Sequence, residues 1–131
     1  MSGRTALPGR ATVEKVREVL GFCERPEQPQ DVRIESRWEK DGLSGEEISW
    51  SVGYGPRARA WFFRPSQAKG PLPGVLALHD HGGFKYFGKE KIAQGPDAPA
   101  GVLRDWFQRI YGGRAWVNAL ARRGFAVLVN D

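Results

Sequence analysis

The chain has 131 residues and a formal net charge of +5 at pH 7, a length that allows one domain and is too short for two. Its 40% apolar residues and five tryptophans exclude disorder, and its single cysteine, Cys23, excludes an internal disulfide. No apolar stretch has the roughly 20 residues of a membrane span, no signal-peptide core is visible, and the positive charges are scattered, so we expect a cytoplasmic protein that binds neither membrane nor nucleic acid.

The first thirty residues predict a short peripheral helix and a linker. Thr12 can cap the helix and Gly21 can end it. One face of the helix is apolar and carries Val13, Val16 and Leu20. A proline-containing linker, 26–30, follows. We therefore expect one domain over 1–131, made of an N-terminal helix and linker (1–30) and a sheet region (31–131).

Three segments with partial alternation of apolar and polar residues open the sheet region: 32–38, 47–53 and 57–63. Turn residues separate them, namely Asp41 with Gly42, and then the glycine- and proline-containing run 53–56. The simplest arrangement of such segments is an antiparallel meander.

Two further segments, 75–78 and 125–129, are continuously apolar. Such strands are typical of parallel sheets, where helices bury both faces. Parallel neighbours need a crossover, and 113–123 predicts its helix, with Gly124 as the left-handed cap. The expected inner face of that helix consists of Ala115, Trp116, Ala119, Leu120 and Arg123.

The connection from Phe84 to Gly112 is longer than a strand-to-helix link requires. Part of it has helical spacing, in Leu103, Trp106, Phe107 and Ile110. The segment 94–101, with two prolines and two glycines, predicts irregular structure. We expect this insertion to border a binding site, because functional groups collect where the carboxyl ends of parallel strands meet the following loops.

The turn 79–84 occupies that place. It is rich in glycine and histidine and comes directly after the apolar segment 75–78. Backbone N–H groups in such a turn can point into a cleft and stabilise a developing oxyanion. From spacing alone, a turn in which Gly82 and Gly83 merely reverse the chain is equally acceptable.

The sequence Leu78-His-Asp-His-Gly-Gly83, followed by a helix and the strand 124–131, resembles the N-terminal part of α/β-hydrolases of the dienelactone hydrolase and acetyl xylan esterase type. The resemblance implies an α/β-hydrolase fold that is apparently truncated, an antiparallel meander followed by a parallel strand-helix-strand unit. It implies that the His81 N–H is an oxyanion donor and that Gly82 and Gly83 allow close approach. Asp80 stands where the family usually has glycine, and aspartate tolerates unusual backbone angles.

The activity implied by the resemblance is hydrolysis of a small-molecule ester through a seryl acyl-enzyme, without a cofactor, and Phe84 is a candidate for contact with substrate. The family's nucleophile sits in a Gly-x-Ser-x-Gly elbow, with its acid and histidine later in the chain. Ser44 comes nearest, but Glu46 stands where the second glycine belongs. We therefore expect an N-terminal fragment that is inactive by itself, and leave its oligomeric state open.

Three alternatives use the same residues. His79 and His81 form an H-x-H pair that could bind a metal, with Asp97, Asp105 or Asp131 as a third ligand; we favour no metal. The run 84–91 interleaves aromatic residues with lysines, as single-strand nucleic-acid platforms do. We favour instead a loop whose aromatic residues pack inward while its lysines are solvated. A non-enzymatic interaction module is the third alternative.

Overall fold

The computed structural model describes residues 9–21 and 28–131. Within them, five strands form one mixed sheet in the order β1-β2-β3-β5-β4. The strands are β1 (Gln30–Lys40), β2 (Leu43–Ser51), β3 (Ala58–Pro65), β4 (Gly74–Ala77) and β5 (Ala126–Asn130). The helices are α1 (Gly9–Val19), the 3-10 turn η1 (Lys89–Lys91), α2 (Gly101–Tyr111) and α3 (Trp116–Ala121).

The antiparallel meander expected from the sequence is confirmed. β1 pairs with β2, and β2 with β3, both antiparallel. The first reversal uses Asp41 and Gly42, which both adopt positive φ, 50° and 75°. β2 starts at Leu43, earlier than the alternation suggested, because the two-residue reversal lets pairing resume at once: Lys40 lies opposite Leu43.

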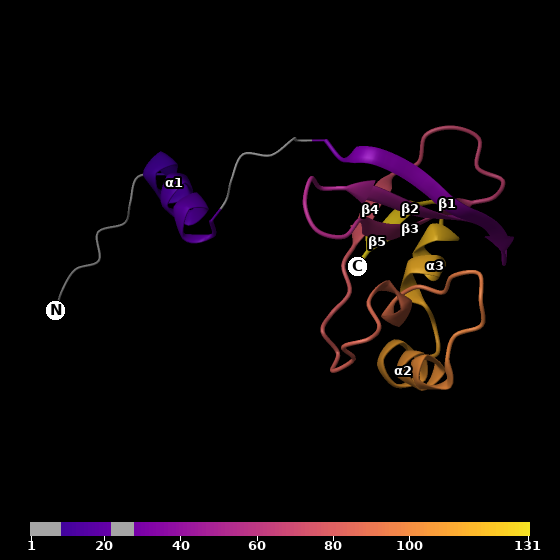
Figure 1. Cartoon of the computed structure of the whole chain (residues 1–131). Helices are drawn as coiled ribbons and strands as arrows, with labels where there is room; N and C mark the ends of the chain where they lie inside the picture. The colour runs from indigo at the N-terminus through magenta and orange to yellow at the C-terminus, as the bar shows by residue number, and fades with distance from the viewer. Residues whose placement is uncertain (1–8, 22–27) are drawn as a thin grey trace.

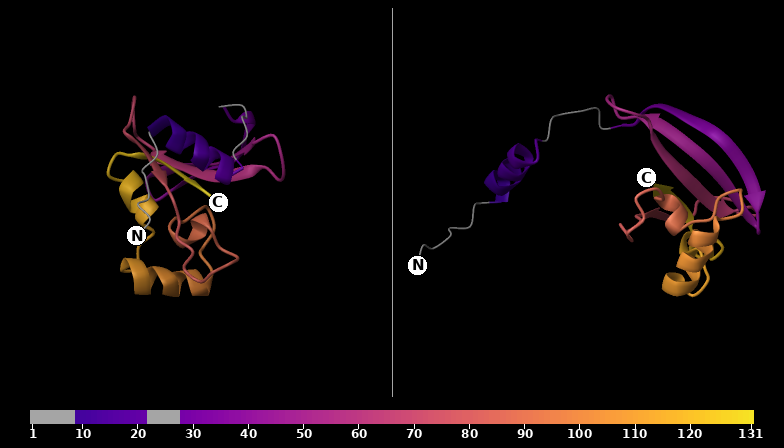
Figure 2. Two further views of the ribbon diagram at one scale, coloured as in Figure 1. Left: turned by 90° about the vertical axis from the view of Figure 1, so that its left-hand side faces the viewer. Right: turned by 60° about the horizontal axis from the view of Figure 1, so that its bottom comes forward.

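The parallel unit is also confirmed. β4 runs parallel to β5, with Val75 opposite Val127 and Ala77 opposite Val129, and β5 runs antiparallel to β3. The expectation that this apolar strand is buried on both faces is wrong, because Leu76 and Leu78 are 62% and 69% exposed. Figures 1 and 2 show the reason: η1, α2 and α3 all lie on one side of the sheet.

The inner face of α3 differs from the predicted one. Val117 and Ala121 are fully buried, whereas Trp116 and Leu120 are only partly covered and Arg123 is exposed. The helix approaches β3 and β5, and Val117 and Ala121, four residues apart, lie on the same face of it. The prediction that Gly124 caps this helix is wrong, because α3 ends at Ala121 and its C-cap is Arg122 in a right-handed conformation. Gly124 adopts its φ of +98° two residues after that cap, in the turn before β5.

The insertion between β4 and α3 contains α2, as its spacing predicted, with Leu103, Trp106 and Phe107 buried and Ile110 48% exposed. The segment before it is irregular. The buried side chain of Asn118 holds that segment: its Oδ1 accepts from the Gln94 N–H at 2.8 Å, and its Nδ2 donates to the Gln94 carbonyl at 2.9 Å. Together with the Val117 N–H, which donates to the Ile92 carbonyl at 3.2 Å, these bonds join α3 to the insertion.

The core lies between the sheet and these helices. It consists of Leu43, Phe63, Ala77, Ile92, Ala93, Val117, Ala121, Val127 and Val129. Phe63 of this core meets Trp38 and Trp61, which pack against the core, and the three rings contact edge to face with centroids 5.9 to 6.3 Å apart.

The N-terminal helix α1 is peripheral, as expected, and lies apart from the sheet (Figure 1). Its apolar residues Val13, Val16 and Leu20 are 54%, 50% and 73% exposed. Cys23 and part of the linker 26–30 lie outside the described residues. Of the helices described here, none combines the length and the apolar character that crossing a membrane requires.

Candidate active site

The turn 79–84 leaves the carboxyl end of β4 and lies beside the end of β5. Ala77 pairs with Val129, so two residues further on, His79 and Asp131 leave the sheet at the same edge. Both line an open cleft of about 620 Å³, together with His81, Phe84 and Phe87. This is where the sequence placed its candidate site, because parallel strands present their carboxyl ends at one edge.

Two consecutive glycines give the turn its shape. Gly82 and Gly83 have φ of +52° and +74°, a region that glycine occupies without steric cost. A Cβ at Gly82 would lie 2.6 Å from Asp80 Oδ1 and 2.7 Å from Trp106 Cη2, whereas a Cβ at Gly83 would meet nothing within 4 Å. Gly82 is therefore required for space as well as for its backbone angle.

The backbone N–H groups of the turn differ in whether they donate a hydrogen bond within the chain. The Gly83 N–H donates to His81 Nδ1 at 3.2 Å. Among the hydrogen bonds of the described residues, none uses the N–H of His81 or of Gly82. Of these two residues, His81 lines the cleft, and its N–H is the donor that the family resemblance implied.

Asp80 does not use the tolerance of unusual backbone angles that the sequence suggested for this position. Its backbone does not adopt positive φ, which among described non-glycine residues occurs only at Asp31 and Asp41. Its carboxylate instead accepts a hydrogen bond from Tyr111 Oη at 2.9 Å. Burial, and then this bond to Asp80, raise the pKa of Tyr111 above its usual value of 10.0. The aspartate thus ties the turn to the end of α2.

Two lysines next to the turn are buried, contrary to the expectation that the lysines of 84–91 are solvated. Lys89 and Lys91 are 5% and 1% exposed. Lys91 Nζ donates to the carbonyl oxygens of Asp80 and His81, the second at 3.0 Å. The sequence gives no sign of this, because lysines interleaved with aromatic residues are ordinarily solvated.

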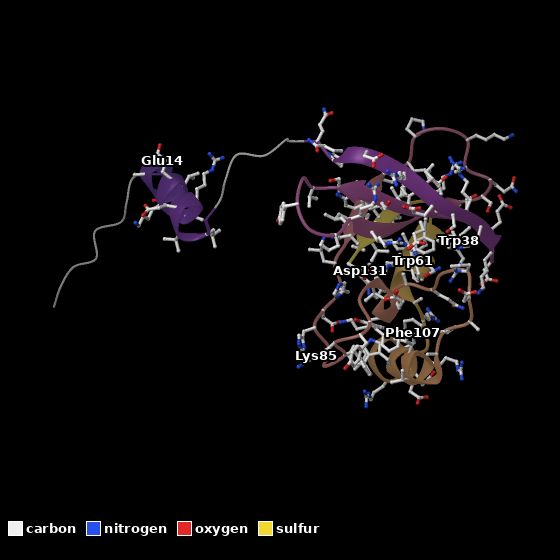
Figure 3. The ribbon with its side chains drawn as sticks, in the orientation of Figure 1. Glu14, Trp38, Trp61, Lys85, Phe107 and Asp131 are labelled. Atoms are coloured by element: carbon white, nitrogen blue, oxygen red, sulfur yellow. The ribbon has the colours of Figure 1, made fainter. Side chains whose placement is uncertain are left out.

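Lys89 fastens the same segment to the sheet. Its N–H donates to Asp131 Oδ1 at 2.8 Å, its Nζ pairs with Asp131 Oδ2, and its Nζ lies 5.1 Å from the centroid of the Trp61 ring. Figure 3 shows Trp61 and Asp131 on neighbouring parts of the sheet, with Lys85 at the periphery of the loop. An ammonium over an indole face adds cation–π attraction to the ion pair.

The aromatic residues of the loop follow a mixed pattern. Phe84, the candidate for substrate contact, is partly buried against Trp106, with centroids 5.2 Å apart, and against Phe87 at 6.2 Å. Tyr86 is 95% exposed. The expected inward packing thus holds for the phenylalanines and is wrong for Tyr86. The phenylalanines form an apolar wall of the cleft.

The metal alternative finds no support in the part of the chain that the structure describes, which holds no group of three or more His, Cys, Asp or Glu side chains arranged to bind an ion. His79 and Asp131 share the cleft, but Asp131 is committed to Lys89. Ser44 lies on β2 and donates to Glu39 at 3.4 Å. No serine or cysteine of the described residues lines the cleft beside the turn.

Comparisons with known proteins bear on the fold of the chain. No protein-family model matches the chain. A Bacillus subtilis (strain 168) protein, named as a hydrolase, YtaP, is 34% identical over 73 residues, which are 56% of this chain and 23% of that protein.

Two solved structures are similar. One, from Bacteroides fragilis NCTC 9343 and described as an acetyl xylan esterase, has a TM-score of 0.65 and 14% identity over 93% of this chain and 29% of its own. A brefeldin A esterase, described as a bacterial homologue of human hormone-sensitive lipase, has a TM-score of 0.36 and 21% identity over 93% of this chain and 26% of its own. The first likeness confirms at the level of the fold the resemblance to acetyl xylan esterases, and the chain spans less than a third of each of these proteins.

Proposed function

We propose that this chain provides the N-terminal part of an enzyme that cleaves small-molecule carboxylic esters through a seryl acyl-enzyme. The observation that carries the proposal is the pair of unengaged N–H groups on His81 and Gly82, at the carboxyl end of β4 beside an open cleft. The names of the similar proteins, a hydrolase and an acetyl xylan esterase, support the same chemistry.

In this mechanism the chain's own contribution is electrostatic. A serine from another part of the protein attacks the ester carbonyl and passes its proton to a histidine base, and the carbonyl oxygen becomes an oxyanion. The N–H of His81 donates to that oxygen, in a turn whose shape is already fixed. A fixed donor of this kind contributes about 10²–10³ in kcat. The bare backbone of Gly82 and Gly83 lets the oxygen approach.

Phe84 and Phe87 line the same cleft, and we assign them to contact with the apolar part of the ester. Because the described lining holds neither serine nor cysteine, the 131-residue chain is expected to hydrolyse p-nitrophenyl acetate no faster than buffer. Turnover that a serine-directed phosphonate blocks stoichiometrically would contradict the assignment of the nucleophile to another part of the protein.

The decisive experiment separates the His81 backbone from its side chain, in a protein that contains this chain and the nucleophile. His81→Ala keeps the N–H and should retain most of kcat. His81→Pro removes the N–H and should lower kcat about 100-fold or more. Circular dichroism of both variants checks that the fold survives. An equal loss in both would assign the role to the imidazole and refute the backbone donor.

A further inference from the structure

The 3-10 turn η1 places a lysine against the turn that carries the candidate oxyanion donors. Lys91 is 1% exposed, and its Nζ donates to the carbonyl oxygens of Asp80 and His81. Within the described residues no carboxylate lies within ion-pair distance of Lys91. Burying such a side chain is costly unless polar partners compensate, and here the partners are these two carbonyls.

The two carbonyls belong to the same peptide groups as the two unengaged donors. The carbonyl of Asp80 and the N–H of His81 form one planar trans peptide, and the carbonyl of His81 and the N–H of Gly82 form the next. In a trans peptide the C=O and N–H point in opposite directions. A cation that holds both oxygens on one side therefore fixes both N–H groups on the other.

The same contact also changes the strength of the donors. A hydrogen bond at the oxygen of a peptide polarises the group and makes its N–H a better donor, because bonds in a chain strengthen one another. The Asp80 oxygen lies 3.0 Å from His79 Nδ1 as well, so the peptide that contains the His81 N–H has two polar neighbours at its oxygen. Bonds to charged donors are the stronger kind.

We propose that Lys91 is a positioning residue that orients and polarises the His81 and Gly82 N–H groups for an oxyanion. The catalytic meaning of this rests on the proposed function, whereas the effect on the two amides is a property of this chain alone. Tyr111 provides the matched control, because it holds the same turn through the Asp80 carboxylate and touches neither peptide oxygen.

The test is base-catalysed hydrogen exchange of the two amides, measured by nuclear magnetic resonance on the 131-residue chain. An amide that is polarised at its oxygen loses its proton to hydroxide more readily. Lys91→Met should slow exchange at His81 and Gly82 about tenfold, whereas Lys91→Arg and Tyr111→Phe should leave it close to that of the unmodified chain. A merely structural role predicts the opposite sign, because a loosened turn exposes its amides.

A measurement without substitution covers the case in which Lys91→Met does not fold. In the unmodified chain, His81 and Gly82 should exchange faster, relative to their intrinsic rates, than the amide of Gly55, which lies in an exposed turn. Equal rates would overturn the proposal, as would unchanged or faster exchange in a folded Lys91→Met. The proposed function is tested separately, in a longer protein that contains this turn and the nucleophile. If that protein hydrolyses no ester while the amides still exchange as expected, the proposed function fails and the effect of Lys91 on the amides stands.

Discussion

Because one edge and one face of β4 are uncovered, we expect the chain to associate. Substitutions on the uncovered face should prevent this association. β4 pairs only with β5 among the described strands, so its other edge has unpaired backbone groups, and Leu76 and Leu78 extend from its open face. An apolar edge of this kind templates association with other strands. We expect the unmodified chain to self-associate and to bind a hydrophobic dye.

Replacing both leucines with lysine should suppress association at a small cost in folding free energy. Leu76 is already 62% exposed and Leu78 69% exposed, and full burial of a leucine stabilises by about 1.5–3 kcal/mol. The covered third of each side chain then contributes about 0.5–1 kcal/mol. Ala77→Lys is the contrasting variant, because Ala77 is 2% exposed and packs in the core, and a buried lysine there should cost more than about 3 kcal/mol.

Size-exclusion chromatography, dye binding and thermal melting measure these effects together. The Leu76→Lys, Leu78→Lys variant should elute as a monomer, bind less dye and melt at most about 10 °C below the unmodified chain. The reasoning is refuted if the unmodified chain is a monomer that melts cooperatively without dye binding. It is also refuted if the double variant associates to the same extent.

Two further predictions concern the turn. Gly82→Ala should destabilise the chain by about 2–4 kcal/mol, and Gly83→Ala by only about 1–2 kcal/mol. Both residues have positive φ, but only a Cβ at Gly82 meets Asp80 and Trp106. Equal losses in denaturant unfolding would contradict this contact. The raised pKa of Tyr111 stabilises the folded state below pH 10, and this contribution is lost as the pH rises through the folded-state pKa. Tyr111→Phe should therefore reduce the fall in the free energy of unfolding at alkaline pH. Tyr86→Phe, at a 95% exposed position, should leave that fall unchanged. An identical effect of both variants would refute the assignment of the alkaline effect to Tyr111.

The elements themselves could be predicted because their signals are local. Turn residues such as Asp41 and Gly42 specify a reversal by their own backbone preferences, and the spacing of Leu103, Trp106 and Phe107 specifies a helix with one buried face. The position of the candidate site followed from a general rule about the ends of parallel strands. None of these inferences needs a partner from elsewhere in the chain.

What could not be predicted depends on partners that are distant in sequence. The apolar run of β4 indicated two buried faces, but the helices cover only one, and hydrophobicity alone does not say on which side a helix packs. The sequence predicts that Lys91 is solvated, whereas in the structure it contacts the Asp80 and His81 carbonyls. The hydrogen bond between Tyr111 and Asp80 joins residues 31 positions apart, and no spacing rule anticipates it.

The paired hydrogen bonds between Asn118 and Gln94 determine how the loop beside the cleft can move. An amide side chain that engages both the N–H and the carbonyl of one residue imitates one rung of a β ladder, so the middle of the insertion is bound to α3 on the nanosecond scale of loop fluctuations. Lys89 holds an earlier part of the insertion to the end of β5, because its N–H and its Nζ both donate to the Asp131 carboxylate. The tip around Lys85 and Tyr86 lies outside these two attachments, and Tyr86 is 95% exposed, so we expect this tip to move more than the rest of the loop.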